Sequence, residues 1–472
     1  MHLVTKRLHE QYGPIVRIGP NHLDLDCPSL IKTCLDRNGL WRKTEFYAVS
    51  GVLHEGKVAY NIFSETNSAE HARIKKPIAK YYSMNGVLTL QPHIDNVLGH
   101  FVRQIDARFV GTGEEMGPAF DFGQWVLYLG WDMVGKVTYG KRVGYLDKGY
   151  DFDGTLNVED KAMDYLVTVG MQPGLDKFLD KNRLYRIGPP SFGSLVAISL
   201  QHLIRRYDGS DKHDPAKPDF MDRYIEAKAE HPDIVDDQRL LSYLLANMAA
   251  GADTTALTLR SVFYLSLKHP SVWARLQAEV LAAPFARKKT MDLPASFADA
   301  RALPYLEAVV REALRLYPGN CFPMERYVPA GGVTLPDGSF VGEGAAVGFN
   351  AYVLHRNAGV WGADAEAFRP ERWLRDEAAG EGEDAFRRRL TDMNNCDLSF
   401  GAGQRKCIGM NLGMMQVYKT VATLVALYEF ELADPEREWR IHNSIFPRQS
   451  GVEFRMRKRE GVVVRGGLDL YD

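Results

Sequence analysis

One cysteine, Cys407, lies in a glycine-rich stretch whose residue types suit the binding of a metal-containing ligand. The stretch reads FGAGQRKCIG over residues 400–409 and runs directly into a long apolar segment. A thiolate just before a helix is stabilised by the positive end of the helix dipole. Gly401 and Gly409 let the backbone approach a flat, bulky ligand, and Arg405 supplies a fixed cation. Together these features indicate a haem whose iron is held by the Cys407 thiolate.

The same stretch resembles the haem-binding loop of the cytochrome P-450 superfamily, F-x-x-G-x-R-x-C-x-G. Every fixed position of that motif is matched, by Phe400, Gly403, Arg405, Cys407 and Gly409. The resemblance implies a protein that binds haem b through Cys407, with its neighbours in the loop, Gly401 included, around the cofactor. From the residues alone, a buried cysteine in a glycine-rich turn is the alternative.

A second group of polar residues interrupts an apolar helical pattern at 237–268. Asp253 and Thr254 follow Gly251, which weakens a helix interior. Threonine can donate to a carbonyl one turn earlier and bend the helix. Such a bend would expose a hydroxyl and a carboxylate, the groups needed to hydrogen-bond dioxygen and to relay protons. A helix N-cap is the alternative interpretation.

The stretch AGADTT at 250–255 resembles the superfamily's [A/G]-G-x-[D/E]-T-[T/S] motif on its long central helix. The resemblance implies Thr254 as the alcohol that hydrogen-bonds dioxygen and Asp253 as the proton-relay acid.

Glu312 and Arg315 lie three residues apart, on one face of a predicted helix with apolar neighbours. A solvated surface pair is the alternative and would contribute little to stability. The pair resembles the superfamily's E-x-x-R motif, and the later segment FRPERW resembles its F-x-P-E-R segment. By that resemblance Arg372 completes a triad with the pair, and the triad holds the scaffold of the haem loop.

Haem carries two carboxylates that need cations. Besides Arg405, the resemblance implies His71 and Lys75 as the superfamily's H-x-x-x-R pair, with lysine in place of arginine, and Arg326 as the arginine after the E-x-x-R helix. The lysine keeps the charge and loses the bidentate geometry. His355 has a weaker claim to the same role. Solvated surface charges are the alternative for each of these residues.

Several further cations could form a basic patch on the cysteine side of the haem and steer an acidic redox partner. Scattered surface cations are the alternative. The residues are Lys75, Lys76, Arg387, Arg388, Arg389 and Lys406.

Composition and length suit a globular protein. The chain has 472 residues, 45% hydrophobic and 25% charged, with a net charge of −2, which gives no reason to expect a nucleic-acid partner. Five cysteines, an odd number with no C-x-x-C spacing, favour a reducing compartment. We expect a monomer.

No stretch of roughly 18 or more uninterrupted apolar residues predicts a membrane span, and the start does not resemble a signal peptide. The segment HEQYGPIVRIGPNHLDL resembles the one that follows an N-terminal membrane anchor in microsomal members. We therefore expect that the anchor is missing from this chain, that the anchored form lies on the cytosolic face of the endoplasmic reticulum membrane, and that this chain is soluble or peripheral. A naturally soluble member is the alternative.

The pattern of elements predicts a mainly α fold with a small β-rich lobe built from both ends of the chain. Residues 14–26 predict a β-hairpin, and an Asp-Gly turn lies within a further β region at 325–350. Helical periodicity is clearest at 98–109, 237–268, 271–283, 303–316 and 408–428. Polar stretches at 207–220, 284–297 and 375–389 predict surface loops. We interpret residues 1–472 as one haem-thiolate catalytic domain with the cytochrome P-450 fold.

The resemblance implies a monooxygenase that activates O2 with electrons from an NADPH-cytochrome reductase. It would hydroxylate, demethylate, desaturate or couple a small apolar molecule of secondary metabolism. Three stretches resemble the corresponding sequences of fungal microsomal members, the pisatin-demethylase-like group among them. They are YGPIVRIGP, HRNAGVWG and FRPERWL. Two alternatives stay open: a haem-thiolate isomerase or dehydratase that needs no external electrons, and a haem-binding sensor without turnover.

Family resemblance also implies which segments contact the substrate. They are 46–63 before His71, Asn247 to Ala250, Asn320 to Phe322, and Ser444 to Phe446. Their apolar and aromatic side chains suggest a cavity that accepts rings. An equally good interpretation is that these aromatic residues belong to the core. The segment 188–204 could rest against a bilayer or pack as an ordinary helix.

Overall fold

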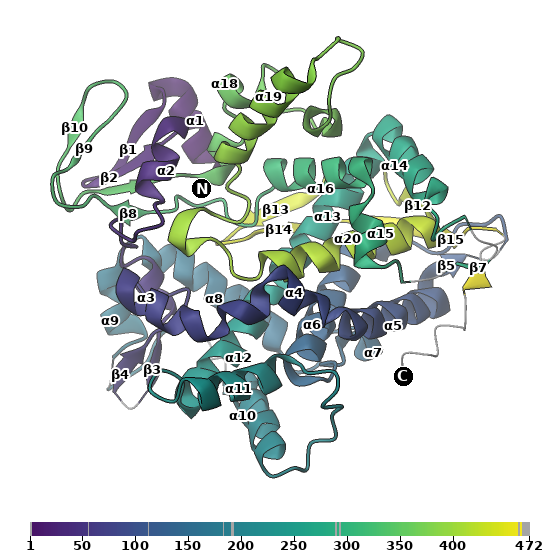
Figure 1. Ribbon diagram of the computed structural model, residues 1–472, viewed down its shortest axis with the longest axis horizontal. Coiled ribbons are helices and arrows are strands. Elements are labelled where there is room, and N and C mark those ends of the chain that lie inside the picture. The colour runs from purple at the N-terminus through teal and green to yellow at the C-terminus, as the bar shows by residue number, and fades with distance from the viewer. Residues whose placement is uncertain are drawn as a thin grey trace.

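Helices make up most of the molecule, and a β-rich lobe lies at one corner (Figure 1). The computed structural model describes residues 2–54, 56–111, 113–182, 184–189, 193–287, 290–291, 294–460 and 463–464. Within these ranges the helices of eight or more residues are α1 (His2–Tyr12), α3 (Ser68–Lys75), α5 (Gln91–Phe109), α6 (Phe122–Tyr139), α8 (Thr155–Gly170), α10 (Gly193–Tyr207), α11 (Phe220–Glu230), α12 (Asp237–Gly251), α13 (Asp253–Lys268), α14 (Pro270–Ala282), α16 (Pro304–Leu316), α19 (Glu383–Cys396) and α20 (Met410–Leu427).

The β-rich lobe combines the N-terminal hairpin with strands from the later half of the chain, as predicted. Its sheet has the order β1 (Ile15–Gly19), β2 (His22–Leu25), β11 (Ala346–Gly348) and β8 (Arg326–Tyr327). The β2–β11 pair is parallel and the two outer pairs are antiparallel. The predicted Asp-Gly turn joins β9 (Val333–Thr334) to β10 (Phe340–Val341), where Gly338 has a φ of 86°.

A second sheet lies in the helical part of the molecule. It pairs β12 (Tyr428–Leu432) with β15 (Glu453–Lys458), and β15 also pairs with β5 (Val110–Gly111) and β6 (Phe120–Asp121). Beside it, β13 (Arg440–Asn443) and β14 (Pro447–Ser450) form a hairpin whose turn carries Ser444 to Phe446. The sequence analysis predicted no strands at 110–121 or 428–464.

The main core forms where long helices cross one another. Apolar side chains of α5, α6, α13, α16 and α20 are fully buried there. All five helical predictions are confirmed, and the one at 237–268 is realised as two helices, α12 and α13, separated by Ala252. The predicted distortion therefore lies in the middle of the core.

One loop prediction was wrong. The polar stretch 375–389 was expected to be a loop, but α19 begins within it, at Glu383. Two acidic residues in its first turn complement the helix dipole, and Glu383 pairs with Arg387 four residues on. The stretch 207–220 is a connection, as predicted, and part of 284–297 lies outside the described residues. None of the helices that the structure describes combines the length and apolar character needed to cross a bilayer.

Candidate active site

The Cys407 loop presents the sulfur at the start of α20. The Cys407 N–H donates to Phe400 O at 2.8 Å, which closes the loop on itself. Cys407 is exposed, whereas the other four cysteines are buried. Surrounding atoms desolvate the thiolate and raise the pKa of the thiol, while the N–H groups of Gly409 and Met410 and the charge of Lys75 oppose that rise. The thiol therefore faces donors that stabilise its ionised form when a metal binds.

Two glycines of this loop are required by the backbone. Gly401 and Gly403 have φ angles of 68° and 62°, in the left-handed region that favours glycine. A Cβ on Gly403 would also overlap with the carbonyl oxygen of Leu35, so the loop packs directly on the segment after the short helix α2 (Ile31–Cys34). A Cβ on Gly409 would lie 3.9 Å from the Cys407 sulfur. Because glycine has no side chain, the space beside the sulfur stays free at this position.

Five basic residues from four separate segments gather beside this loop. Four of them are the predicted His71, Lys75, Arg326 and Arg405, and the fifth, Lys43, was missed by the sequence analysis. Lys43, His71 and Arg326 are buried. Lys43 lies over the Tyr47 and Phe63 rings, and a β-bridge joins its backbone to that of Arg326.

None of the five lies within ion-pair distance of a carboxylate in the described part of the chain. Lys43 donates to Phe63 O at 2.8 Å, Arg405 to Glu65 O at 2.7 Å, and Arg326 to Glu325 O at 2.7 Å. Their partners are therefore neutral carbonyls, which leave the positive charge uncompensated.

The pKa values of these residues reflect that excess of positive charge. Burial, with the repulsion of Arg405, Lys75, Lys43 and Arg326, lowers the pKa of His71 to about 3. Burial and the charges of Arg326 and Arg405 hold the pKa of Lys43 well below its usual range. Burial and Arg326 lower the pKa of Arg405 to about 10. Such a cluster suits an anionic ligand.

Haem b fits these residues. The cations could neutralise its two carboxylates, and Cys407 offers one thiolate to its iron. Lys75 connects the two regions, because it faces the Cys407 sulfur and also donates to Gln404 O. Among the described residues no cluster of three or more His, Cys, Asp or Glu side chains could hold a metal ion by itself.

The break between α12 and α13 is built by hydroxyl groups, as the sequence predicted. Thr254 Oγ1 donates to Ala250 O at 3.0 Å, and Thr255 Oγ1 lies 3.0 Å from both Gly251 O and Gln416 Oε1. The Thr255 contact holds the break against α20, the helix that follows the cysteine loop. Sequence analysis had not assigned a role to Thr255.

Two glycines allow α6 to pack closely on the residues of the same break. A Cβ on Gly130 would lie 2.8 Å from Ala252 O, and a Cβ on Gly251 would lie 2.7 Å from Val134 Cγ2. Close approach of the two helices therefore depends on the absence of side chains at both positions.

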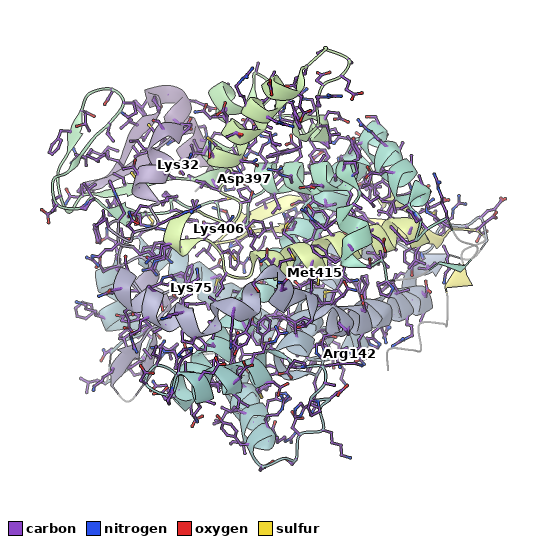
Figure 2. The ribbon with its side chains drawn as sticks, viewed as in Figure 1. Lys32, Lys75, Arg142, Asp397, Lys406 and Met415 are labelled. Carbon is purple, nitrogen blue, oxygen red and sulfur yellow. The ribbon has the colours of Figure 1, made fainter. Side chains whose placement is uncertain are left out.

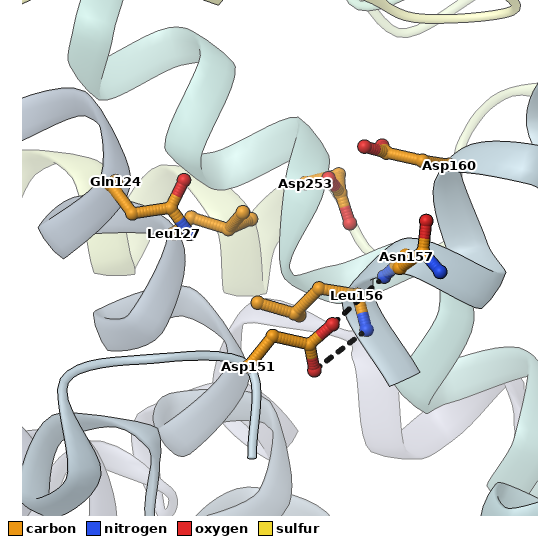
Figure 3. Close-up of a pocket in the computed structure, with 7 residues that line it drawn as sticks. All are labelled: Gln124, Leu127, Asp151, Leu156, Asn157, Asp160 and Asp253. Atoms are coloured by element: carbon orange, nitrogen blue, oxygen red, sulfur yellow. Dashed lines mark hydrogen bonds between the residues drawn. The ribbon is translucent and has the colours of Figure 1, made fainter. Parts of the chain in front are cut away.

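Asp253 and Thr254, the first two residues of α13, are buried to different extents. Thr254 is half-buried, and Asp253 is buried with its carboxyl in a polar pocket beside α8 (Figure 3). Asp253 Oδ2 has no hydrogen-bond partner among the described residues. Burial raises the pKa of Asp253 to about 6, against the opposing charge of Arg260. An acid with such a pKa can both take and give a proton near neutral pH.

The predicted triad is present and buried. Arg315 donates to both Glu312 oxygens, at 2.8 and 2.7 Å, and Arg372 Nε donates to Glu312 Oε1 at 3.3 Å. Trp373 Nε1 adds a further donor to Glu312 at 2.9 Å. The predicted helix, α16, is thereby fixed to the FRPERW segment, and the surface-pair alternative is excluded.

His355 connects this triad to the cysteine loop and does not face the cation cluster. Its Nε2 accepts from the Leu398 N–H at 2.8 Å, so the proton lies on Nδ1, which donates to Arg315 O at 2.9 Å. Burial lowers the pKa of His355 to about 4. Its suggested role toward the haem carboxylates was wrong, because both ring nitrogens are already occupied.

Two of the six cations of the predicted basic patch are paired with acids. Arg387 pairs with Glu383, and Arg389 pairs with Glu381 while donating to the backbone of η5 (Pro370–Trp373). Lys75 and Lys406 remain on the side of the molecule shown in Figure 2, where the cysteine loop reaches the surface.

Three of the four segments expected to contact substrate meet in one apolar cluster, separate from the main core. It joins the 46–63 segment and the strand region after α16 to the β13–β14 turn and to α8. Its members include Phe46, Val49, Leu166, Val169, Phe322 and Ile445. Phe46 and Phe322 stack with centroids 6.2 Å apart, and Phe46 also rests on the backbone of Gly170. The fourth segment, at Asn247, belongs instead to a buried polar network with Tyr82 and Thr138.

Comparison with known proteins identifies the family that this fold and site define. Residues 1–453 match the family model described as Cytochrome P450. The cytochrome P450 monooxygenase cfoH of Aspergillus candidus is 57% identical over 470 residues, covering 100% of this chain and 86% of that protein. The cytochrome P450 monooxygenase cicH of Emericella nidulans is 33% identical over 463 residues, covering 98% of this chain and 89% of its own length.

The chain belongs to the cytochrome P450 family. It is a monooxygenase that binds haem b, as the cysteine loop and the cation cluster had indicated.

Proposed function

We propose that this monooxygenase takes electrons from an NADPH-dependent reductase and oxidises a small apolar molecule of secondary metabolism by hydroxylation, demethylation, desaturation or coupling. The observation that carries the substrate class is the apolar cluster of Phe46, Phe322 and Ile445 with α8. Aromatic and aliphatic side chains from separate segments suit an apolar, ring-containing ligand. Placement in the pisatin-demethylase-like group is part of the same proposal.

Within the site, we assign Cys407 as the iron ligand and the five basic residues as the holders of the haem carboxylates. Haem supplies the oxygen chemistry when it is bound. Thr254 holds a hydroxyl at the helix break, where it can hydrogen-bond dioxygen. Asp253 supplies protons to that hydroxyl, because its raised pKa lets it exchange protons near neutral pH.

The redox partner and the membrane are assigned to different surfaces. Lys406 and Lys75, beside the cysteine loop, would meet an acidic surface of the reductase. An exposed apolar group suits the surface of the endoplasmic reticulum membrane in an anchored form. Its members are Leu175 at 50%, Phe178 at 69%, Leu184 at 95% and Ile187 at 63% exposure.

The assignment of Thr254 is tested by coupling, the product formed per NADPH consumed. A screen of small apolar natural products by the haem spin-state shift first provides a substrate. We expect Thr254→Ala to keep substrate binding, to lower coupling by about tenfold and to release peroxide. The control is Thr391→Ala, which removes an exposed hydroxyl with the same bond to a preceding carbonyl, 2.7 Å from Arg387 O. Unchanged coupling in Thr254→Ala would show that this hydroxyl is not required.

A further inference from the structure

A polar pocket connects the surface to Asp253. It lies between α6, the first turns of α8 and the first residue of α13, with a volume of about 220 Å³ (Figure 3). Its rim carries the exposed Asn157 and Asp160, and Asp253 lies buried at its inner end. Besides two leucines, the walls offer amides and carboxylates, which give water the polar partners that it needs.

The three carboxylates of the pocket have different surroundings. Asp151 accepts from the backbone N–H groups of Leu156 and Asn157, at 3.4 and 3.1 Å, and so stabilises the start of α8 (Figure 3). Asp160 forms an ion pair with Arg448 of β14. Of the three, Asp253 is the one with a buried carboxylate oxygen that has no hydrogen-bond partner among the described residues. The contacts that hold α8 at this pocket are therefore made by Asp151 and Asp160 and not by Asp253.

A second acid, Glu159, lies beside Asp253 and has no assigned role. Its side chain is on the buried face of α8 with 2% exposure, and neither carboxylate oxygen has a hydrogen-bond partner in the described part of the chain. Burial raises the pKa of Glu159 well above its usual value, the charges of Asp253 and Asp160 raise it further, and the charge of Arg448 opposes the rise. A buried carboxyl whose oxygens accept no hydrogen bond favours the protonated form.

The charged groups around the two acids come from several elements. Arg260 of α13 and Arg448 of β14 favour the ionised form of Asp253, whereas Asp160 of α8 opposes it. Asp121 of β6 lies near Arg260 and balances part of its charge. Asp253 is therefore the acid of the pair that ionises first, while Glu159 holds its proton.

We propose that Glu159 and Asp253 together store the protons that a turnover consumes, and that the pocket is the inlet through which solvent replaces them. This rests on the proposed relay through Asp253 and Thr254. Monooxygenation takes two electrons and two protons with each O2 and releases one oxygen atom as water. When both carboxyls are protonated, they hold the two protons next to the helix break, and Asp253 reaches that form as the pH falls through about 6.

Each transfer is balanced. Asp253 gives its proton toward Thr254 and becomes a carboxylate. Glu159 then gives its proton to Asp253 through a bridging water, because no direct hydrogen bond joins the two groups. Asp253 passes this second proton toward Thr254, which leaves both acids as carboxylates. Two protons from solvent then enter through the pocket: the first protonates Asp253 and passes on to Glu159, and the second protonates Asp253 again.

The first test is a direct titration of the acids by infrared spectroscopy, which needs no substrate. A protonated buried carboxyl has a C=O stretching band that shifts in D2O. We expect the haem-loaded protein to show one such band at neutral pH that is absent from Glu159→Gln, and a second that titrates near pH 6 and is absent from Asp253→Asn. Absence of the Glu159 band at neutral pH overturns the proposed store.

The second test is the solvent isotope effect on NADPH oxidation by the haem-loaded enzyme with reductase and O2, measured without added substrate. We expect Glu159→Gln to enlarge the isotope effect by about twofold and to move its pH dependence. The double variant Gln124→Leu/Asn157→Leu, which makes the pocket walls apolar, should enlarge it similarly. The control Glu230→Gln removes an exposed acid that pairs with Lys80 and should change neither quantity.

Asp253→Asn separates the two levels of the proposal. If Asp253→Asn leaves the isotope effect unchanged, the proposed relay is wrong, and so is the proposed role of Asp253. If it changes the isotope effect while Glu159→Gln and the apolar pocket variant behave like the parent, the relay stands and the store and inlet are overturned.

Discussion

Lys43 illustrates how a single side chain depends on a ligand of opposite charge. It is 6% exposed, it lies against two aromatic rings, and its neighbours Arg326 and Arg405 repel it. A buried cation with no carboxylate partner destabilises a fold, and a bound anion reverses that effect. Lys43 is thus expected to destabilise the haem-free protein and to stabilise the haem-bound one.

Lys43→Met tests this reversal. We expect the haem-free variant to be at least as stable as the parent toward urea, because an unpaired charge is removed. The haem-bound variant should lose haem to an excess acceptor protein about tenfold faster, since a charge-assisted hydrogen bond contributes about 1.5–3 kcal/mol.

Lys32→Met is the matched control for Lys43→Met, because Lys32 is exposed. It should change neither stability nor haem release. Haem release from Lys43→Met at the rate of the parent would exclude Lys43 from the cofactor site.

At the scale of elements, the position of the helix break depends on the contact between α6 and α13. Gly130 allows α6 to lie against Ala252 O, and any side chain there meets backbone atoms that cannot move aside easily. The break should therefore shift when Gly130 is replaced, even though Gly130 is not a predicted site residue.

Gly130→Ala is expected to destabilise the protein by about 1–3 kcal/mol through overpacking and to lower the coupling of NADPH oxidation to product. Gly413→Ala, in the interior of α20, is the control. Apart from the neighbouring backbone of α20, no atom of the described residues lies within 4 Å of the added Cβ, so the variant should be neutral or more stable by up to about 1 kcal/mol. Equal thermal midpoints for the two variants would contradict the close-contact argument.

Sequence analysis was most successful where a residue acts through its local neighbours. Cys407 and its loop were predictable because the motif lies within ten residues, and the bend at Thr254 because the hydroxyl acts on a carbonyl four residues earlier. Lys43 was not predictable, because its burial depends on contacts with Phe63 and with the backbone of Arg326. Glu159 was missed for the same reason, since the charged groups Asp253 and Arg448 near it come from α13 and β14.

At the scale of the whole molecule, Glu312 joins α16 to the FRPERW segment, and His355 extends the connection to the cysteine loop. Removal of Glu312 leaves the guanidinium groups of Arg315 and Arg372 buried without their shared carboxylate. The two parts of the chain that must meet around the cofactor would then be held by weaker contacts, among them the hydrogen bond from the Tyr305 hydroxyl to Glu371.

Glu312→Ala should destabilise the protein by about 3–5 kcal/mol and give little folded, haem-loaded material. The control is Glu307→Ala, on the same helix as Glu312. It breaks an exposed ion pair between Glu307 and Arg301, whose charged atoms lie 3.3 Å apart, and should cost less than about 1 kcal/mol. A normal yield of haem-loaded Glu312→Ala protein would show that the triad is dispensable for assembly.

The bond between the Cys407 sulfur and the haem iron supports every assignment made for the site. It is tested most directly by the absorbance of the reduced, carbon-monoxide-bound protein, compared with Cys407→Ser and with Cys396→Ser, which changes a buried cysteine elsewhere. The parent and Cys396→Ser should show the red-shifted band of a thiolate-ligated haem, and Cys407→Ser should lack it. A red-shifted band that persists in Cys407→Ser would contradict the assignment of Cys407 as the iron ligand.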